Sequence, residues 1–150
     1  HNIKEEQIKN IKNQLKKSVV LFSNKEGKNL VDFDVFIIDT IGILTKIYSY
    51  AEIAYVGGGF GTGIHNILEP ATFGVPIIIG PKYQKFQEAK DLVTLGSCLV
   101  VHNQEDLYNT FNLLIEDENI RKEKGNLSQQ FVLKNKNATQ VIMQYLKTSL

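Results

Sequence analysis

Short apolar runs alternate along the chain with stretches in which apolar residues recur at helical spacing. The apolar runs predict five strands, at residues 18–22, 34–39, 53–57, 76–80 and 97–101. The helical spacing predicts helices over 2–17, 43–51, 66–73, 84–95 and 117–133, with two more that begin near 103 and 137. Because strands alternate with helices and several strands are apolar throughout, we expect an α/β fold: a Rossmann-like parallel sheet with helices on both faces.

Individual residues indicate where several of these helices begin, end and face the core. Gly74 and Pro76 should end the helix over 66–73. Asn103 with Asp106, and Asn137 with Gln140, have the spacing of capping boxes at the starts of the later helices. The buried stripes of those two helices should be Leu107, Phe111, Leu114 and Ile115, then Val141, Ile142, Tyr145 and Leu146.

Length, charge and cysteine content narrow the class of protein. A chain of 150 residues suits one domain with a sizeable core, and a net charge of +1 gives no electrostatic reason to expect nucleic acid as a partner. No apolar run approaches the roughly 20 residues that span a bilayer. Cys98 is the only cysteine and sits in an apolar run, so we expect a buried structural thiol. Histidines at 1, 65 and 102 are too scattered for a metal site.

The stretch AYVGGGFGTGIHNILEPATFGVPIIIG, residues 54–80, carries the candidate chemistry, with five glycines within positions 57–63. It fits neither the G-x-G-x-x-G fingerprint nor a P-loop. The loop still follows a predicted strand, and parallel sheets bind ligands beyond the carboxyl ends of their strands. Glycines also let a ligand approach the backbone closely, and the start of a helix favours a phosphate. We therefore expect a phosphate site formed by Gly58, Gly59, Gly61 and Gly63 with Asn66; the alternative is a tight turn with no ligand.

Glu69 and His65 each allow two interpretations. Glu69 lies three residues after Asn66, so it could complete a capping box at the start of the helix. It could instead bind a ligand, and since a carboxylate repels phosphate, it would then accept hydrogen bonds from neutral donors such as ribose hydroxyls. His65 could be an ordinary turn residue.

Residues 37–95 resemble the nucleotide-binding signature of the 3-deoxy-D-manno-oct-2-ulosonic acid (Kdo) transferases of lipopolysaccharide synthesis. The resemblance rests on the glycines at 57–59, on His-Asn-Ile-Leu-Glu-Pro at 65–70, and on Gly80-Pro81 followed by Phe86 and Glu88. The resemblance also includes the stretch before the glycine loop, in which an apolar strand leads to Gly42-Ile43-Leu44.

This resemblance implies the C-terminal half of a GT-B glycosyltransferase. Residues 1–150 would be most of a domain that binds CMP-Kdo, as a fragment that lacks the N-terminal acceptor domain. Its donor-binding residues would be Gly58, Gly59, Gly61, Gly63, His65, Asn66, Glu69 and Lys85. The family transfers Kdo to a lipid A precursor without a cofactor or a required metal.

The family's catalytic base, a Glu, and its membrane contact belong to the absent N-terminal domain. No catalytic residue is therefore expected in this fragment, which should be soluble and inactive by itself. The full-length protein would act at the cytoplasmic face of the bacterial inner membrane.

Two departures from the family pattern and two alternative functions stay open. The chain has Gly42-Ile43-Leu44 where members commonly have Gly-Glu-Leu, and Lys85 where many have Asn before the Phe. A lysine could meet the donor's phosphate or carboxylate as a point charge, with a different geometry.

The chain could also belong to another GT-B enzyme that uses a UDP- or GDP-sugar. Because it shows no nucleophile–base pair, it could instead be a nucleotide-binding module without chemistry.

Overall fold

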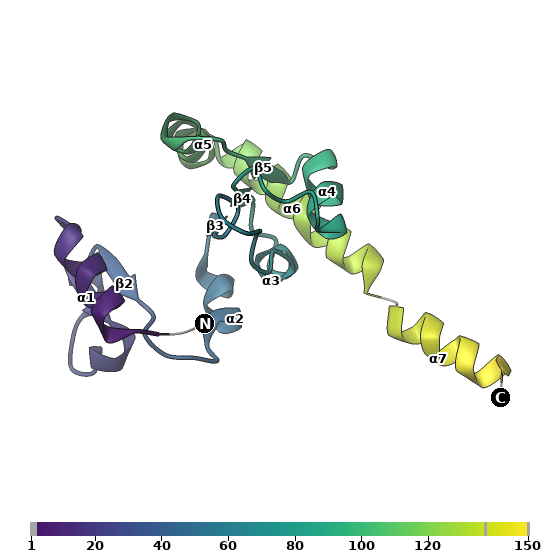
Figure 1. The fold of residues 1–150 in the computed structure, drawn as a ribbon, viewed down its shortest axis with the longest axis horizontal. Helices are drawn as coiled ribbons and strands as arrows, with labels where there is room; N and C mark the ends of the chain where they lie inside the picture. The colour runs from purple at the N-terminus through teal and green to yellow at the C-terminus, as the bar shows by residue number, and fades with distance from the viewer. Residues whose placement is uncertain (1–2, 137, 150) are drawn as a thin grey trace. The chain divides into compact units, whose positions relative to one another are not determined.

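The computed structural model describes residues 3–136 and 138–149 (Figure 1). The strands are β1 (Val19–Leu21), β2 (Val35–Ile37), β3 (Ala54–Val56), β4 (Ile77–Ile79) and β5 (Cys98–Val100). The helices are α1 (Glu5–Gln14), α2 (Leu44–Ile47), α3 (Leu68–Thr72), α4 (Gln87–Thr94), α5 (Gln104–Glu116), α6 (Glu118–Asn135) and α7 (Ala138–Ser149). Three short 3-10 turns lie at Phe22–Asn24, Leu30–Asp32 and Tyr48–Tyr50. Every predicted strand is present, and each is three residues long.

The chain divides into two compact units, His1–Lys46 and Ile47–Leu150. In the first unit β1 and β2 pair in parallel, with Val19 opposite Val35. In the second unit β3, β4 and β5 form a parallel sheet in that order, with Ala54 opposite Ile77 and Ile77 opposite Cys98. The α/β class and the parallel strand direction are confirmed, and the strands form two sheets, one in each unit.

Serine–aspartate pairs hold both ends of the sheet in the first unit. The Ser18 hydroxyl and backbone N–H both donate to Asp34, just before β2. The Ser23 hydroxyl and backbone N–H donate in the same way to Asp39, just after β2. These charge-assisted hydrogen bonds fix the register of two short strands that share few ladder bonds of their own.

The central strand β4 shows why the second sheet needs helices on both faces. Ile77, Ile78 and Ile79 are all fully buried, and their side chains alternate between the two faces. Ile77 and Ile79 pack in a cluster with residues of α3 and α4, while Ile78 packs in a second cluster that includes Leu114 of α5. An apolar run of this kind is typical of a strand in a parallel sheet that is covered on both sides.

Several predicted helix boundaries are confirmed and several burial predictions are wrong. The Asn103 side chain accepts a hydrogen bond from the Asp106 N–H, as expected of a cap. Gly74 follows α3 with φ +70°, the left-handed conformation that favours glycine after a helix.

The Ile115 side chain was expected in the buried stripe of α5 but is 61% exposed. Positions 107, 111 and 114 already form the face of α5 that packs on the second cluster, and Ile115 lies about a quarter turn away from Leu114.

The expected buried face of α7 is also wrong for the residues that can be compared. Ile142, Tyr145 and Leu146 are 58%, 69% and 45% exposed. Asn137 lies outside the described residues, as do the side chains of Gln140 and Val141, so the proposed cap is not compared. Among the described helices, none is long and apolar enough to cross a membrane.

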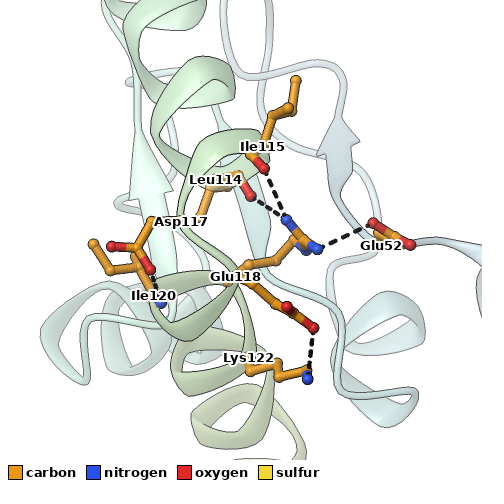
Figure 2. A network of polar contacts seen from close by, with 8 residues as sticks. Glu52, Leu114, Ile115, Asp117, Glu118, Ile120 and Lys122 are labelled. Carbon is orange, nitrogen blue, oxygen red and sulfur yellow. Dashed lines mark hydrogen bonds and ion pairs between the residues drawn. The ribbon is translucent and has the colours of Figure 1, made fainter.

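Arg121 of α6 connects three elements of the second unit. Figure 2 labels its partners Glu52, Leu114 and Ile115. Its guanidinium donates to the carbonyl oxygens of Leu114 and Ile115 in the last turn of α5, at 2.7 and 3.2 Å. The same group lies 3.4 Å from a carboxylate oxygen of Glu52, which precedes β3. A cation at a helix C-terminus satisfies carbonyls that have no partner within the helix. Arg121 thus stabilises the turn between α5 and α6, in which Asp117 caps α6 through the Ile120 N–H.

Candidate functional site

The glycine loop, residues 57–63, begins directly after β3 at the carboxyl edge of the second sheet. The neighbouring strand β4 ends at the same edge and continues into Gly80. The backbone of the two segments is in direct contact, and the Lys82 N–H donates to the Gly59 oxygen at 2.9 Å. The sequence therefore placed this loop correctly at the edge where parallel sheets bind ligands.

Three of the glycines are required by packing. A Cβ atom on Gly59 would lie 2.7 Å from the backbone nitrogen and Cα of Gly80. Gly58 has φ +93°, and a Cβ there would be 2.2 Å from the Gly63 oxygen. Gly63 has φ +145°, and a Cβ there would be 2.9 Å from the ring of Phe86. Any side chain at these positions would force the backbone or the ring to move.

Gly61 differs from these three glycines. It is exposed, its φ is not positive, and a Cβ would make only an ordinary contact, 3.5 Å from the Gly58 oxygen. No packing inside the loop therefore explains a glycine at this position. Gly57 is similar, since a Cβ there would meet only the His65 ring at 3.8 Å, but of the two only Gly61 is exposed to an approaching ligand.

Two of the loop's backbone donors are already engaged. The N–H groups of Gly61 and Gly63 both donate to the Gly58 oxygen, at 2.8 and 3.4 Å. The His65 N–H donates to the Gly57 oxygen at 3.0 Å, which closes the loop at its base. In this conformation a phosphate would therefore be held by other N–H groups of the loop.

Asn66 and Glu69 are brought together, though not in the capping box that was one of the two interpretations of Glu69. Helix α3 begins at Leu68, so Asn66 precedes the helix by two residues. The Asn66 side-chain oxygen accepts from the Leu68 N–H at 3.0 Å, and its amide donates to the Glu69 carboxylate at 3.0 Å. In a capping box Glu69 would instead accept from a backbone N–H. The carboxylate is half-buried and lies at the start of α3, beside the end of the glycine loop.

Tyr48 is a neighbour of Glu69 that the sequence analysis did not identify. Burial raises the pKa of the Tyr48 phenol, and the negative charge of Glu69 raises this pKa further. The electrostatic contact places the tyrosine near the carboxylate. The spacing of residues does not predict this neighbour, because Tyr48 lies 21 positions before Glu69 in the sequence and β3 comes between them.

Lys85, the remaining candidate residue, does not join this group through a described contact, and neither do His102 and Cys98. Lys85 is exposed in the segment between β4 and α4, and among the described residues no hydrogen bond or ion pair connects it to the loop. His102 pairs instead with Asp106 of α5 at 3.5 Å. Burial raises the pKa of the Cys98 thiol to about 12, so this thiol stays protonated at neutral pH.

The described residues contain no group of three or more His, Cys, Asp or Glu side chains that could hold a metal ion. A groove of about 420 Å³ lies between α3, α4 and α6, and its walls include Leu68, Phe131, Glu88 and Asp91. None of the expected donor-binding residues lines this groove. The candidate site is therefore the glycine loop with the Asn66–Glu69 pair, and the groove lies outside it.

No protein-family model matches the chain, but curated relatives do. It is 35% identical over 123 residues to a 3-deoxy-D-manno-octulosonic acid transferase of Rickettsia typhi, a match that covers 80% of this chain and 27% of the relative. It is 32% identical over 149 residues to the transferase of the same name from Chlamydia trachomatis, covering 97% of this chain and 34% of the relative. The chain thus spans about a third of the length of these relatives.

The fold also matches a solved structure, the C-terminal CMP-Kdo binding domain of WaaA from Acinetobacter baumannii. The TM-score is 0.74 over 85% of this chain and 67% of that one, at 21% sequence identity. At this identity the match shows the fold alone. Together with the sequence matches, it confirms the resemblance drawn from the glycine loop and the His-Asn-Ile-Leu-Glu-Pro segment. The chain belongs with the 3-deoxy-D-manno-octulosonic acid transferase family and corresponds to about a third of such a protein.

Proposed function

We propose that residues 1–150 form the donor-binding part of a Kdo transferase, which transfers Kdo from CMP-Kdo to a lipid A precursor in lipopolysaccharide biosynthesis. The relatives carry the name of this transferase, and the domain of matching fold is described as binding CMP-Kdo. The observation that carries the proposal is the glycine loop at the carboxyl edge of the second sheet. Its exposed Gly61 has no packing reason to be a glycine.

Each candidate residue has a role in this proposal. The backbone of residues 58–63, with Asn66, holds the phosphate of the nucleotide, and Glu69 accepts hydrogen bonds from the ribose hydroxyls. His65 closes the loop through its backbone N–H. Lys85 attracts the phosphate or the Kdo carboxylate as a mobile charge from the exposed segment before α4.

The chemistry itself is assigned to the rest of the protein. General acid–base catalysis needs a positioned proton acceptor, and the family resemblance puts that Glu in an N-terminal acceptor domain, together with the membrane contact. Transfer would need neither a cofactor nor a metal. We expect purified residues 1–150 to bind the donor and to show no Kdo transfer. Measurable transfer would instead require a base among His65, Glu69 and Glu88 of this chain.

The whole protein would act at the cytoplasmic face of the bacterial inner membrane.

Two alternative functions can be distinguished from a Kdo transferase by the ligands that they need. Another GT-B enzyme would prefer a UDP- or GDP-sugar, since the same loop chemistry serves any nucleotide phosphate. A regulatory module would bind a nucleotide and need no acceptor.

Calorimetric titration of the chain with CMP, UMP and GMP tests the proposal directly. We expect CMP to bind most tightly and its affinity to fall when Gly61 is replaced by valine. Preference for UMP or GMP would favour the alternative enzyme. Absence of binding by all three nucleotides would overturn the assignment of a donor site to this chain.

A further inference from the structure

The segment that follows β4, residues 80–86, contacts the glycine loop at both of its ends. At the start of the segment, Gly80 packs against Gly59, and the Lys82 N–H donates to the Gly59 oxygen. At its end, the Phe86 ring packs against Gly63. One neighbouring segment therefore holds the loop at two positions, Gly59 and Gly63.

Phe86 is itself held by contacts with residues outside the loop. It occupies the position before α4, its N–H donates to the Tyr83 oxygen at 2.9 Å, and its oxygen accepts from the Lys90 N–H at 3.2 Å. Its side chain packs against the core cluster that contains Ile64, Ile67 and Ala89. A ring fixed by α4 and by the core presents a rigid surface to the loop, because protein interiors are closely packed.

The contact with Gly63 involves only the far end of the ring. A Cβ atom on Gly63 would lie 2.9 Å from Cε2 and 3.1 Å from Cζ of Phe86. Since Gly63 has φ +145°, its backbone runs against the ring where a residue with a side chain could not. The ring thus restricts where the Gly63 backbone can lie, and with it the hydrogen bond from the Gly63 N–H to the Gly58 oxygen.

We propose that Phe86 is a positioning residue for the phosphate-binding loop: its ring fixes the backbone of residues 58–63 in the geometry that accepts the nucleotide phosphate. This inference rests on the proposed function for its ligand, but the effect on the loop is independent of that function. A phosphate site built from backbone donors depends on having those donors fixed before the ligand arrives, because ordering them on binding would weaken affinity.

The test uses Phe86→Leu, which removes the ring atoms that face Gly63 and keeps an apolar side chain toward the core. The matched control is Phe131→Leu, because Phe131 of α6 packs against the same core cluster and is not among the nearest neighbours of any glycine in the loop. Both variants lose a similar part of a partly buried ring, so their melting temperatures should fall by similar amounts.

Two measurements then separate positioning from general destabilisation. Amide hydrogen exchange of Gly61 and Gly63 should become faster in Phe86→Leu and stay unchanged in Phe131→Leu, at equal stability. Calorimetry with CMP should show a loss of affinity of about tenfold in Phe86→Leu, equivalent to about 1.4 kcal/mol, and less than about twofold in Phe131→Leu. A double-mutant cycle should show that Gly63→Ala is less harmful to loop exchange in the Phe86→Leu background, where the ring is gone.

The possible results are distinguishable. Equal exchange rates and equal CMP affinities in the two leucine variants would overturn the role of Phe86. If the unmodified chain does not bind CMP, the proposed function fails, and the exchange of Gly61 and Gly63 alone still decides whether the ring positions the loop. Faster exchange with unchanged CMP affinity would show that the ring orders the loop but that the phosphate does not bind there, which also overturns the proposal.

Discussion

Gly125 of α6 faces the carbonyl oxygen of Gly74 so closely that a Cβ atom on Gly125 would lie 2.1 Å from that oxygen. Gly74 is the left-handed residue that ends α3, and Gly125 lies near the middle of α6. The two glycines allow α3 and its following turn to pack directly on the backbone of α6. This contact therefore fixes the C-terminal end of α3, the helix that begins with Leu68 and Glu69, against α6.

Gly125→Ala should therefore destabilise the chain, although alanine is normally better than glycine within a helix by about 1 kcal/mol. The obstructing atom belongs to the backbone, so α3 or α6 must shift, and overpacking of this kind costs about 1–3 kcal/mol. We expect the melting temperature to fall by roughly 4–12 °C, at about 4 °C per kcal/mol. The neighbouring exposed position provides the control, and Asn126→Ala should leave the thermal transition nearly unchanged. A stabilised Gly125→Ala variant would contradict the packing.

Gly61→Val should abolish CMP binding while leaving the fold intact. The position is exposed and a Cβ there makes only an ordinary contact, so the change in the free energy of unfolding should stay within about 0.5 kcal/mol. The valine side chain would occupy the space that a phosphate needs near the backbone. Calorimetry with CMP and a thermal melt check the two halves of the prediction.

Gly59→Ala is the contrasting variant, since its Cβ would lie 2.7 Å from the Gly80 backbone. It should lower stability whether or not a ligand binds. If Gly61→Val binds CMP normally, the glycine loop is only a turn.

Glu69→Gln should weaken CMP binding and leave the melting temperature nearly unchanged. The glutamine oxygen can still accept from the Asn66 amide, so the local hydrogen bond survives. The substitution removes the negative charge of the carboxylate that accepts hydrogen bonds from the ribose. Hydrogen bonds to a charged group contribute about 1.5–3 kcal/mol. Affinity for CMP should then fall roughly 10- to 150-fold, at 1.4 kcal/mol per factor of ten.

A second ligand separates the two interpretations of Glu69. Because 2′,3′-dideoxy-CMP lacks the hydroxyls, Glu69→Gln should weaken its binding far less than that of CMP. Equal weakening of both ligands, or a loss of stability without a change in affinity, would mean that Glu69 only supports the start of α3.

The first unit should lose stability in acid because of Asp34 and Asp39. Hydrogen bonds from the Ser18 hydroxyl and N–H hold the pKa of the Asp34 carboxyl below its usual value, and Ser23 does the same for the pKa of Asp39. A lowered pKa in the folded state stabilises the fold above the ordinary carboxyl pKa of about 3.9. This contribution disappears as the pH falls through the lowered pKa values, when the carboxylates become protonated.

Carbon-13 NMR titration of the carboxyl groups measures these pKa values directly. Ser18→Ala should raise the pKa of Asp34 and leave that of Asp39 unchanged, and Ser23→Ala should do the reverse. The two variants serve as each other's controls. A serine variant that moves both pKa values equally, or neither, would contradict the paired arrangement.

The sequence by itself determined the strands, the order of the elements and the place of the glycine loop in the fold. Three consecutive isoleucines at 77–79 predicted a strand buried on both faces, because only a covered parallel strand has no polar side. Asn103 predicted the start of α5 through its own side chain. The dense glycines after β3 indicated a loop at the ligand-binding edge of the sheet. Each of these is a local property, set by side-chain periodicity or by the conformation of one or two residues.

The tertiary structure alone decided which glycines are needed for packing and which have room for a side chain. Gly59 meets Gly80, Gly63 meets Phe86 and Gly125 meets Gly74, and each partner is distant along the chain. The same limit explains the wrong expectations for Ile115 and for the apolar face of α7. Helical spacing defines an apolar stripe but not the surface that covers it, because burial depends on where other elements lie in space.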